Sequence, residues 1–459
     1  MDQTGLFPTE RDFVRVFPEE LLFLVFSHLK VGKLVELMEI SRGWREAMFN
    51  LPKLFNIGLR EGTENTFKSL FTWLQNWSSR GTDKYLTFNN VELAKWIGID
   101  YIMSMLRRVS IDNLILESTF FDTENLATII KVFDITKNVK RLNFTINIIS
   151  NPLLMLFLDN MSWMLPSLES INLTSFNTND YGHYQTFQLS SLSKYLPSGQ
   201  SRIVASEKVK RLYIKDCGFL VAHLMDIFNN LESVVIVGQA DSDAINSLLE
   251  KNPRIQEFEL FNTNIRIEKV MNGLINSQTF NTLKKFTYMG NSAPTEELPL
   301  LDVKTCFKNL KILNITGVST TLTSLFDIFP IDQITNLTFV SQLLSENGHH
   351  TVRTIFTLFK SVRFLRIVYE GNQIKSHQLS QYLLKSKIKR LVIVNIPNLM
   401  NFCAFMRYLS NSTLDSHQKI LIDVYDPKIQ YSMMEPFIKE GDINSYTCAS
   451  LEGVLISAK

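Results

Sequence analysis

Residues that could carry catalysis are few and widely spaced in this sequence. Seven histidines include one adjacent pair, His349–His350, which lies in the polar segment SENGHHTV and indicates a solvated turn rather than a metal site. The loop motifs GxxxxGK(S/T) and GxGxxG, the zinc motif HExxH and the hydrolase motif GxSxG are all absent. No CxxC pair exists either, because the cysteines are Cys217, Cys306, Cys403 and Cys448. We therefore expect no catalytic residue, no metal, no cofactor and no enzymatic activity in the chain itself.

Side chains suited to binding a protein recur instead at alternate positions of short apolar segments. Tyr, Phe and Arg are the residues that dominate binding energy at protein interfaces. Basic positions near 211–215, 285 and 363–390 flank an acidic patch at 257–259, which would suit a charged peptide, with or without phosphorylation. A charged face that only keeps the chain soluble is the alternative. The candidate substrate-binding residues are Arg211, Tyr213, Lys215, Glu257, Glu259, Phe261, Phe364, Arg366 and Arg390.

These segments belong to a repeat whose core is the pattern apolar-x-x-apolar-x-apolar. Ten clear copies run from VKRLNF at 139–144 to IKRLVI at 388–393, with weaker copies at 111–116, around Leu86, at Ile422 and at 451–456. The middle apolar residues of twelve copies, named repeat positions below, follow one another at steps of 22 to 29 residues, with one step of 41. They are Leu86, Leu114, Leu142, Ile171, Leu212, Val234, Phe258, Phe286, Leu313, Leu337, Leu365 and Leu391. Such an even spacing indicates tandem structural units.

Each unit of this repeat predicts one strand followed by one helix. The strand segment alternates apolar and polar residues, and apolar residues at helical spacing follow, as in 122–134, 243–252 and 376–386. A strand and a helix cannot bury both apolar faces alone, so neighbouring units stack with their strands parallel. We predict an α/β solenoid with parallel strands on the concave face and helices outside; a doubly wound sheet is the alternative. Two insertions, near 174–208 and 290–304, interrupt the period.

Composition and charge exclude several classes of protein. Of the 459 residues, 45% are hydrophobic and only 18 are Gly and 13 are Pro, which excludes a disordered or collagen-like chain. The net charge of +2 provides no field that would attract nucleic acid or a membrane surface. The segment MDQTGLFPTERDF lacks the apolar core of a signal peptide, and the longest apolar stretch, 152–158, is far shorter than the ~20 residues that span a bilayer. We expect an intracellular protein that binds neither nucleic acid nor membrane.

Residues 17–46 differ from the repeats and predict three short helices. Pro18 can open the first helix, and Glu19 and Glu20 suit its positive first turn. An apolar stripe follows, a turn contains Gly32, and Trp44 lies on the apolar side of the third helix. Three short helices cannot hide this much apolar surface from water, which indicates a docking module that a partner completes.

The same stretch resembles the F-box, whose pattern is approximately LPxELLxxIFSYLxxxDLLRLRxVCxRWRE. The alignment needs no gap, and Phe17, Ile40 and Ser41 replace similar residues. Lys33, Glu36 and Gly43 depart from the pattern, which changes surface charge and leaves the apolar positions intact. Residues 51–59, LPKLFNIGL, resemble the segment that links F-boxes to repeats. The matching residues are Pro18, Glu20, Leu21, Leu22, Phe26, Ser27, Leu29, Leu34, Leu37, Trp44, Arg45 and Glu46.

The repeats in turn resemble leucine-rich repeats over about residues 84–459. The Asn or Cys that usually follows the third apolar position is mostly missing, and the irregular, helix-rich units are similar to the ribonuclease-inhibitor-like type. The predicted organisation is therefore an N-terminal tail at 1–12, an F-box at 13–60, a linking or capping helical segment at 61–83 and the solenoid at 84–459.

An F-box followed by leucine-rich repeats is similar to the substrate receptors of SCF-type ubiquitin ligases. The resemblance implies that the F-box docks on a Skp-family adaptor, and through it on cullin and RING subunits, in the cytoplasm or nucleus. The repeats would hold an unknown target protein for ubiquitination and proteasomal degradation. An F-box scaffold without ubiquitination, for example in a kinetochore or in trafficking, is the alternative. The implied adaptor-binding residues are Phe17, Pro18, Leu21, Leu22, Val25, Phe26, Leu29, Leu34, Leu37, Ile40 and Trp44.

Overall fold

The computed structural model divides into two compact units, residues 1–209 (unit 1) and 210–459 (unit 2). The division falls at the end of the predicted insertion at 174–208. The structure describes residues 22, 25, 28, 29, 37, 56–59, 85–88, 99–107, 111–120, 123–147, 155, 158–161, 164–175, 206–290, 307–316, 329–340, 356, 359–368, 381–383, 385–394, 421–425, 446–449 and 455–457.

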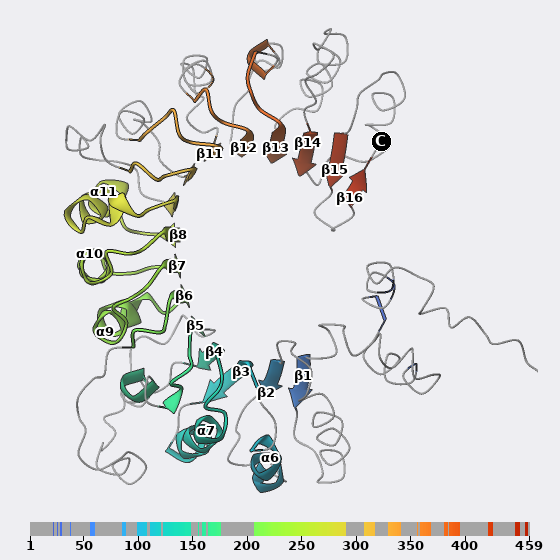
Figure 1. Cartoon of the computed structure of the whole chain (residues 1–459), viewed down its shortest axis with the longest axis vertical. Helices are drawn as coiled ribbons and strands as arrows, with labels where there is room; N and C mark the ends of the chain where they lie inside the picture. Colours follow the sequence, from blue (N-terminus) through green and yellow to red (C-terminus); the bar gives the residue numbers. More distant parts are fainter. Residues whose placement is uncertain are drawn as a thin grey trace, which may run out of the picture. The chain divides into compact units, whose positions relative to one another are not determined.

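Unit 1 is built around a parallel sheet. Its elements are β1 (Asn56–Leu59), β2 (Tyr85–Phe88), α6 (Ile99–Leu106), β3 (Asn113–Phe120), α7 (Thr123–Ile135), β4 (Arg141–Asn147) and β5 (Ser170–Ser175). The strands pair in chain order, each parallel to the next. Helices α6 and α7 lie together on one side of the sheet (Figure 1).

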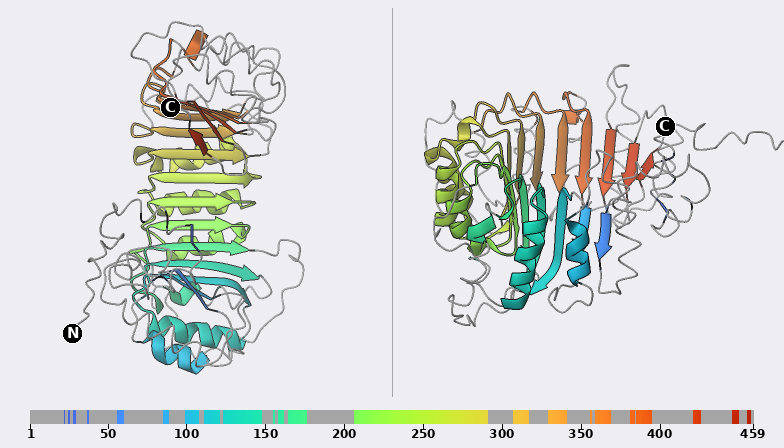
Figure 2. Two further views of the ribbon diagram at one scale, coloured as in Figure 1. Left: turned by 90° about the vertical axis from the view of Figure 1, so that its right-hand side faces the viewer. Right: turned by 60° about the horizontal axis from the view of Figure 1, so that its bottom comes forward.

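Unit 2 repeats this arrangement over a longer stretch. Its first half contains β6 (Arg211–Lys215), η4 (Gly218–Leu220), α9 (Val221–Ile227), β7 (Ser233–Val237), α10 (Ser242–Lys251), β8 (Glu257–Thr263), α11 (Ile267–Asn276), η5 (Thr279–Asn281) and β9 (Lys285–Gly290). The remaining strands are β10 (Ile312–Thr316), β11 (Asn336–Val340), β12 (Phe364–Val368), β13 (Arg390–Val394), β14 (Leu421–Tyr425), β15 (Tyr446–Ala449) and β16 (Leu455–Ser457). Strands β6 to β15 pair in chain order and all are parallel. Figure 2 shows β6 to β9 as successive rungs with α9, α10 and α11 behind them.

The register of the strands confirms the predicted repeat. Each repeat position within a unit lies opposite the repeat position of the next strand, for example Leu114 opposite Leu142 and Phe258 opposite Phe286. All twelve side chains are at most 2% exposed. An even repeat therefore produces one continuous apolar row through each unit, because parallel strands of equal register place equivalent residues side by side.

The sheet begins earlier than the predicted solenoid. Strand β1 lies inside the range 13–60 assigned to the F-box, and its Ile57 pairs with the repeat position Leu86. The segment LFNIGL at 54–59 carries the same apolar pattern, so the signal was present in the sequence. Strand β15 was also not predicted, although INSYTC at 443–448 fits the pattern when Tyr446 and Cys448 count as apolar.

The predicted copy at 451–456 is wrong as a further parallel unit. Strand β16 runs antiparallel to β15, with Cys448 opposite Ile456. The reason is the length of the connection: residues 450–454 join the two strands, whereas a parallel crossover needs a dozen or more residues. The apolar spacing of LEGVLI matches the repeat, but spacing alone does not report strand direction.

Helix α10 of unit 2 is explained by its capping residue and its apolar stripe. Helix α10 starts after Asp241, whose carboxylate accepts hydrogen bonds from the amides of Asp243 and Ala244. Its buried residues, Ala244, Ile245, Leu248 and Leu249, form one apolar stripe toward the sheet. α10 packs between α9 and α11. Helices α7 and α10 lie within one residue of the predicted ranges 122–134 and 243–252, and only part of 376–386 is described.

Aromatic residues fill the core where β8 and β9 meet the segments that follow. The Phe258 and Phe286 rings stack with centroids 6.5 Å apart, and Phe329 lies 6.2 Å from Phe286 and 5.5 Å from Phe307. All four side chains are buried. Because these phenylalanines come from consecutive repeats, the high Phe content of 33 residues is explained in part by this row.

Most of the predicted F-box and nearly all of both predicted insertions lie outside the described residues. In the parts of the chain that are described, no helix is both long and apolar enough to cross a membrane.

Candidate protein-binding surfaces

Four of the predicted adaptor-binding residues are described. Leu22 is 5% exposed, whereas Val25 exposes 51% of its surface, and Leu29 and Leu37 are half-buried. Residues 22, 25 and 37 are helical, and the chain turns at 28–29, where the His28 amide donates to the Val25 carbonyl at 3.3 Å. Val25 thus leaves apolar surface uncovered by its own chain. The other predicted residues, Phe17, Pro18, Leu21, Phe26, Leu34, Ile40 and Trp44, lie outside the described part of the chain.

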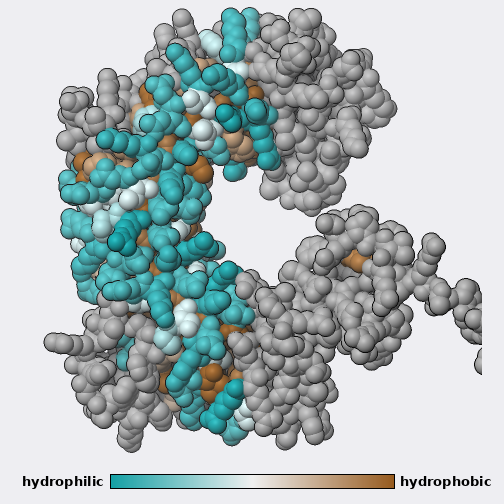
Figure 3. All heavy atoms as spheres, viewed as in Figure 1, coloured by the Kyte–Doolittle hydropathy of each residue, from teal (hydrophilic) through white to brown (hydrophobic). Residues whose placement is uncertain are grey.

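The open face of unit 2 is the side of the sheet opposite the helices. Along each strand, buried residues alternate with residues on this face, as in β6, where Leu212 and Ile214 are buried and Arg211 and Lys215 are exposed. Tyr213 lies between them and is half-buried. Figure 3 shows hydrophilic residues over most of the described surface in its view, with smaller apolar areas between them.

The acidic residues on β8 differ from the prediction in one respect. Glu257 is exposed and accepts a hydrogen bond from the Ser233 hydroxyl at 3.0 Å, but Glu259 is only 9% exposed. Its carboxylate forms an ion pair with Lys285 at 2.7 Å. A partner would therefore have to displace Lys285 to reach Glu259, so Glu259 is a poorer binding residue than predicted. The sequence could not show this pair, because it depends on the packing of β9 beside β8.

The structure brings the predicted substrate-binding residues together in two groups. Arg211, Tyr213 and Lys215 on β6 lie two strands from Glu257 and Phe261 on β8, with β7 between.

The second group lies on neighbouring strands β12 and β13. Arg390 is directly opposite Phe364, and its guanidinium carbon is 5.7 Å from the centre of the Phe364 ring. Arg366 is exposed beside them. Strands β9, β10 and β11 separate this group from the first.

A short apolar row on the open face was missed by the sequence analysis. Val237, Phe261 and Met289 lie opposite one another on β7, β8 and β9. The first two are half-buried and Met289 is 36% exposed. The signal was an apolar residue three positions after the repeat position, a position that holds valine again in β11, β12 and β13. Apolar side chains between charged ones are typical of a protein-binding surface.

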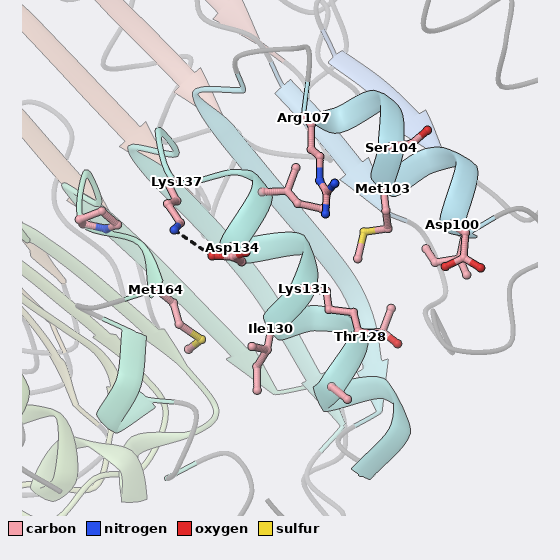
Figure 4. A pocket seen from close by; sticks show the side chains of 14 residues that line it. Asp100, Met103, Ser104, Arg107, Thr128, Ile130, Lys131, Asp134, Lys137 and Met164 are labelled. Atoms are coloured by element: carbon pink, nitrogen blue, oxygen red, sulfur yellow. Dashed lines mark ion pairs between the residues drawn. The ribbon is translucent and has the colours of Figure 1, made fainter. Parts of the chain in front are cut away.

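Unit 1 also contains a groove between α6 and α7 (Figure 4). Apolar and charged side chains share its lining, with Met103 on α6, Arg107 directly after α6, and Lys131 and Asp134 on α7. Asp134 forms an ion pair with Lys137 at 2.8 Å. This mixture is typical of an ordinary helix–helix boundary, and no buried charged side chain that would orient a small ligand is present among the described lining residues.

Across the described ranges, no group of three or more His, Cys, Asp or Glu side chains is arranged to hold a metal ion. His349 and His350 lie outside these ranges. In comparisons with known proteins, no family model matches the chain, and no curated protein matches it.

Proposed function

We propose that this chain is the substrate-recognition subunit of an SCF-type ubiquitin ligase. The observation that carries the proposal is the gap-free F-box-like stretch at 17–46, followed by a sheet of stacked, in-register repeats with an open binding face. The exposed Val25 supports it, because an apolar helical side chain on the surface is what a docking module presents to its partner.

The repeats would be leucine-rich repeats of the ribonuclease-inhibitor-like type. The parallel strands, the helices on one side of each sheet and the steps of 22 to 29 residues support this assignment. The mostly missing Asn or Cys after the third apolar position remains a departure from the common pattern.

In the proposed mechanism this chain supplies position rather than chemistry. The N-terminal module binds a Skp-family adaptor, which links it to the cullin and RING subunits, in the cytoplasm or nucleus. The open face of the repeats binds the target protein. Holding a target lysine near a charged E2 enzyme raises its effective concentration, and this accelerates ubiquitin transfer without any catalytic group from the receptor.

The adaptor interaction is tested by placing a charge on the exposed valine. Val25→Asp introduces a carboxylate into the proposed apolar contact, so we expect recovery of the adaptor to fall about tenfold or more. Because Val25 is exposed in the free chain, the substitution should leave folding intact. Met289→Asp is the matched control, since Met289 is the other large apolar residue that is exposed within the described ranges, and it lies in unit 2. Equal adaptor recovery with both variants would contradict the proposal.

Co-purification of cullin distinguishes the proposed receptor from the alternative scaffold. A receptor should bring adaptor and cullin together, whereas a scaffold that only shares the adaptor should bring adaptor alone. The Phe17→Ala/Pro18→Ala double variant should lose both proteins in the receptor case.

A further inference from the structure

A row of residues lies at the edge of unit 2 where its strands begin. These residues stand two positions before each repeat position and are hydrogen-bonded from strand to strand. The Lys311 amide donates to the Lys284 carbonyl at 2.9 Å, and Thr335 donates to Lys311 at 2.9 Å. Arg363 then donates to Thr335 at 2.8 Å, and Lys389 donates to Arg363 at 2.7 Å. The backbone therefore holds these side chains side by side, at the strand spacing of about 4.8 Å.

The charge of this row changes along unit 2. In its first part the cations have partners: Lys210 pairs with Glu232 at 2.7 Å, and Lys284 donates to the Gln256 amide oxygen at 2.7 Å. Unit 1 shows the same compensation, with Lys140 4.0 Å from Asp112. Pairs of opposite charge along the edge of a parallel sheet stabilise it modestly and cancel each other's charge. Lys284 keeps its charge, but a neutral amide oxygen solvates it.

From β10 to β13 the compensation stops. The row there consists of Lys311, Thr335, Arg363 and Lys389, and further cations precede it. We name six exposed residues the basic edge: Lys308, Lys311, Lys360, Arg363, Lys387 and Lys389. None of the six forms an ion pair with any residue that the structure describes.

Acidic residues are nearly absent around the basic edge. Within 307–316, 329–340, 359–368, 381–383 and 385–394 the one acidic residue is Asp332, which is exposed and forms no ion pair with the six cations. Like charges held at strand spacing repel one another, and nothing in the fold of these strands requires them, because their cores are apolar. An external anion would relieve the repulsion.

We propose that the basic edge binds an extended acidic segment, a run of Asp and Glu, in the protein that the repeats recruit. This proposal rests on the proposed function and names the class of substrate. Carboxylates at alternate positions of an extended chain are about 7 Å apart, within reach of long side chains that project from adjacent strands. Arg363 can bind one carboxylate through two hydrogen bonds, and the lysines provide point charges on either side.

A protein segment fits this surface better than a nucleic acid. Single-stranded nucleic acids need aromatic side chains on which their bases stack. Phe364, which follows Arg363, is half-buried and already lies under Arg390, and Phe307 and Phe359 beside Lys308 and Lys360 are buried. The net charge of +2 also gives the chain no general attraction for polyanions, so binding must depend on this local row.

The experiment measures fluorescence anisotropy of a labelled peptide of alternating Glu and Ser with the purified full-length chain. A peptide with Gln in place of Glu is the probe control. We expect the Glu peptide to bind, the Gln peptide to bind at least about tenfold more weakly, and added salt to weaken binding. The triple variant Lys311→Gln/Arg363→Gln/Lys389→Gln should lose about tenfold or more in affinity.

Two further variants keep the outcome interpretable. Lys210→Gln/Lys251→Gln/Lys284→Gln removes the same number of charges from side chains that already have partners, and it should bind the Glu peptide like the wild type. Arg363→Lys keeps the charge but loses the paired hydrogen bonds, so it should lose less affinity than the Lys311/Arg363/Lys389 variant. Equal affinity of the two triple variants, equal binding of the Glu and Gln peptides, or tighter binding of a uridine oligonucleotide than of the Glu peptide would overturn the proposal. Adaptor recovery by the Lys311/Arg363/Lys389 variant should stay at the wild-type level. A failure of the basic-edge proposal would therefore be distinguishable from a failure of the proposed function, which the Val25→Asp variant tests.

Discussion

At the scale of single residues, the buried side chain of Asn252 makes three hydrogen bonds to the backbone of unit 2. Its amide nitrogen donates to the carbonyls of Phe228 at 3.0 Å and Leu248 at 2.9 Å, and its oxygen accepts from the Leu231 amide at 2.9 Å. The side chain is 1% exposed. Asn252 therefore joins the end of α10 to Phe228 and Leu231, which lie between α9 and β7.

We predict that Asn252→Ala lowers the free energy of unfolding by about 2–4 kcal/mol, because it leaves buried backbone groups without partners. Asn309→Ala is the matched control: Asn309 is exposed and its side chain makes one hydrogen bond, to the Asn281 carbonyl. That variant should lose about 1 kcal/mol or less. Urea denaturation followed by circular dichroism measures both, and similar losses would show that burial of Asn252 is not what matters.

Tyr288 gives the fold a dependence on alkaline pH. Burial, and then the nearby Glu268 carboxylate, raise the pKa of Tyr288 from 10.0 to about 12. Its hydroxyl donates to the Ile265 carbonyl at 2.8 Å. Since the folded state favours the protonated form, the stability that this group contributes is fully present below pH 10 and is lost as the pH rises through about 12.

We predict that the free energy of unfolding of the wild type falls between pH 10 and 12 more steeply than that of Tyr288→Phe. The variant is less stable at neutral pH by about 1 kcal/mol, because the hydrogen bond is lost. Denaturation at several pH values measures the slopes. Parallel slopes for the two proteins would contradict the assignment.

At the scale of elements, the buried phenylalanines connect consecutive repeats of unit 2. Phe286 touches Phe258 on one side and Phe329 on the other, so it lies within a row rather than in an isolated pocket. We predict that Phe286→Ala lowers the free energy of unfolding by about 3–5 kcal/mol, through lost apolar burial and the cavity left behind. Phe364→Ala is a change of the same size, but Phe364 is half-buried and lies on the open face, so we expect it to lower the free energy of unfolding by only about 1–2 kcal/mol. Equal losses in thermal denaturation would contradict a core that runs from repeat to repeat.

The repeat pattern was sufficient to predict strands β2 to β14 and their register within each unit. The leucine, isoleucine, valine or phenylalanine at each repeat position is buried, and stacking these residues leaves one consistent alignment. Helix α10 was predictable within one residue, because its apolar spacing and the acidic cap at Asp241 both appear in the sequence. Strand β1 was missed because residues 51–59 were assigned to the segment that links F-boxes to repeats, and β15 was missed because Tyr446 and Cys448 made its copy of the pattern weaker.

The candidate surfaces were less predictable than the core. Which residues lie on the open face follows from the alternation of each strand, so Arg211, Lys215 and Arg366 were predicted correctly as exposed. The ion pair of Glu259 with Lys285 depends on packing between strands, and alternation carries no information about it. The sequence analysis noted basic positions at 363–390, but it did not show that they form one edge with Lys311, because these residues come together only across strands of different repeats.

At the scale of the whole molecule, the net charge of +2 conceals an uneven distribution. Lys210, Lys251 and Lys285 form ion pairs in the first part of unit 2, whereas the basic edge from β10 to β13 has no described anion beside it other than Asp332. We therefore propose that the chain selects its partners by local surfaces. The apolar surface around Val25 would bind the adaptor, and the basic edge on the repeats would bind the target.

The central claim is that this chain delivers bound proteins for ubiquitination. The most direct measurement is affinity purification of the wild-type chain from cells in which the proteasome is blocked, with the ubiquitin content of each co-purifying protein read by mass spectrometry. Val25→Asp should retain the same target proteins through its repeats while failing to recruit the adaptor. We predict that these targets carry ubiquitin with the wild type and lose most of it with Val25→Asp. Equal ubiquitin content of the targets in the two purifications would contradict the account.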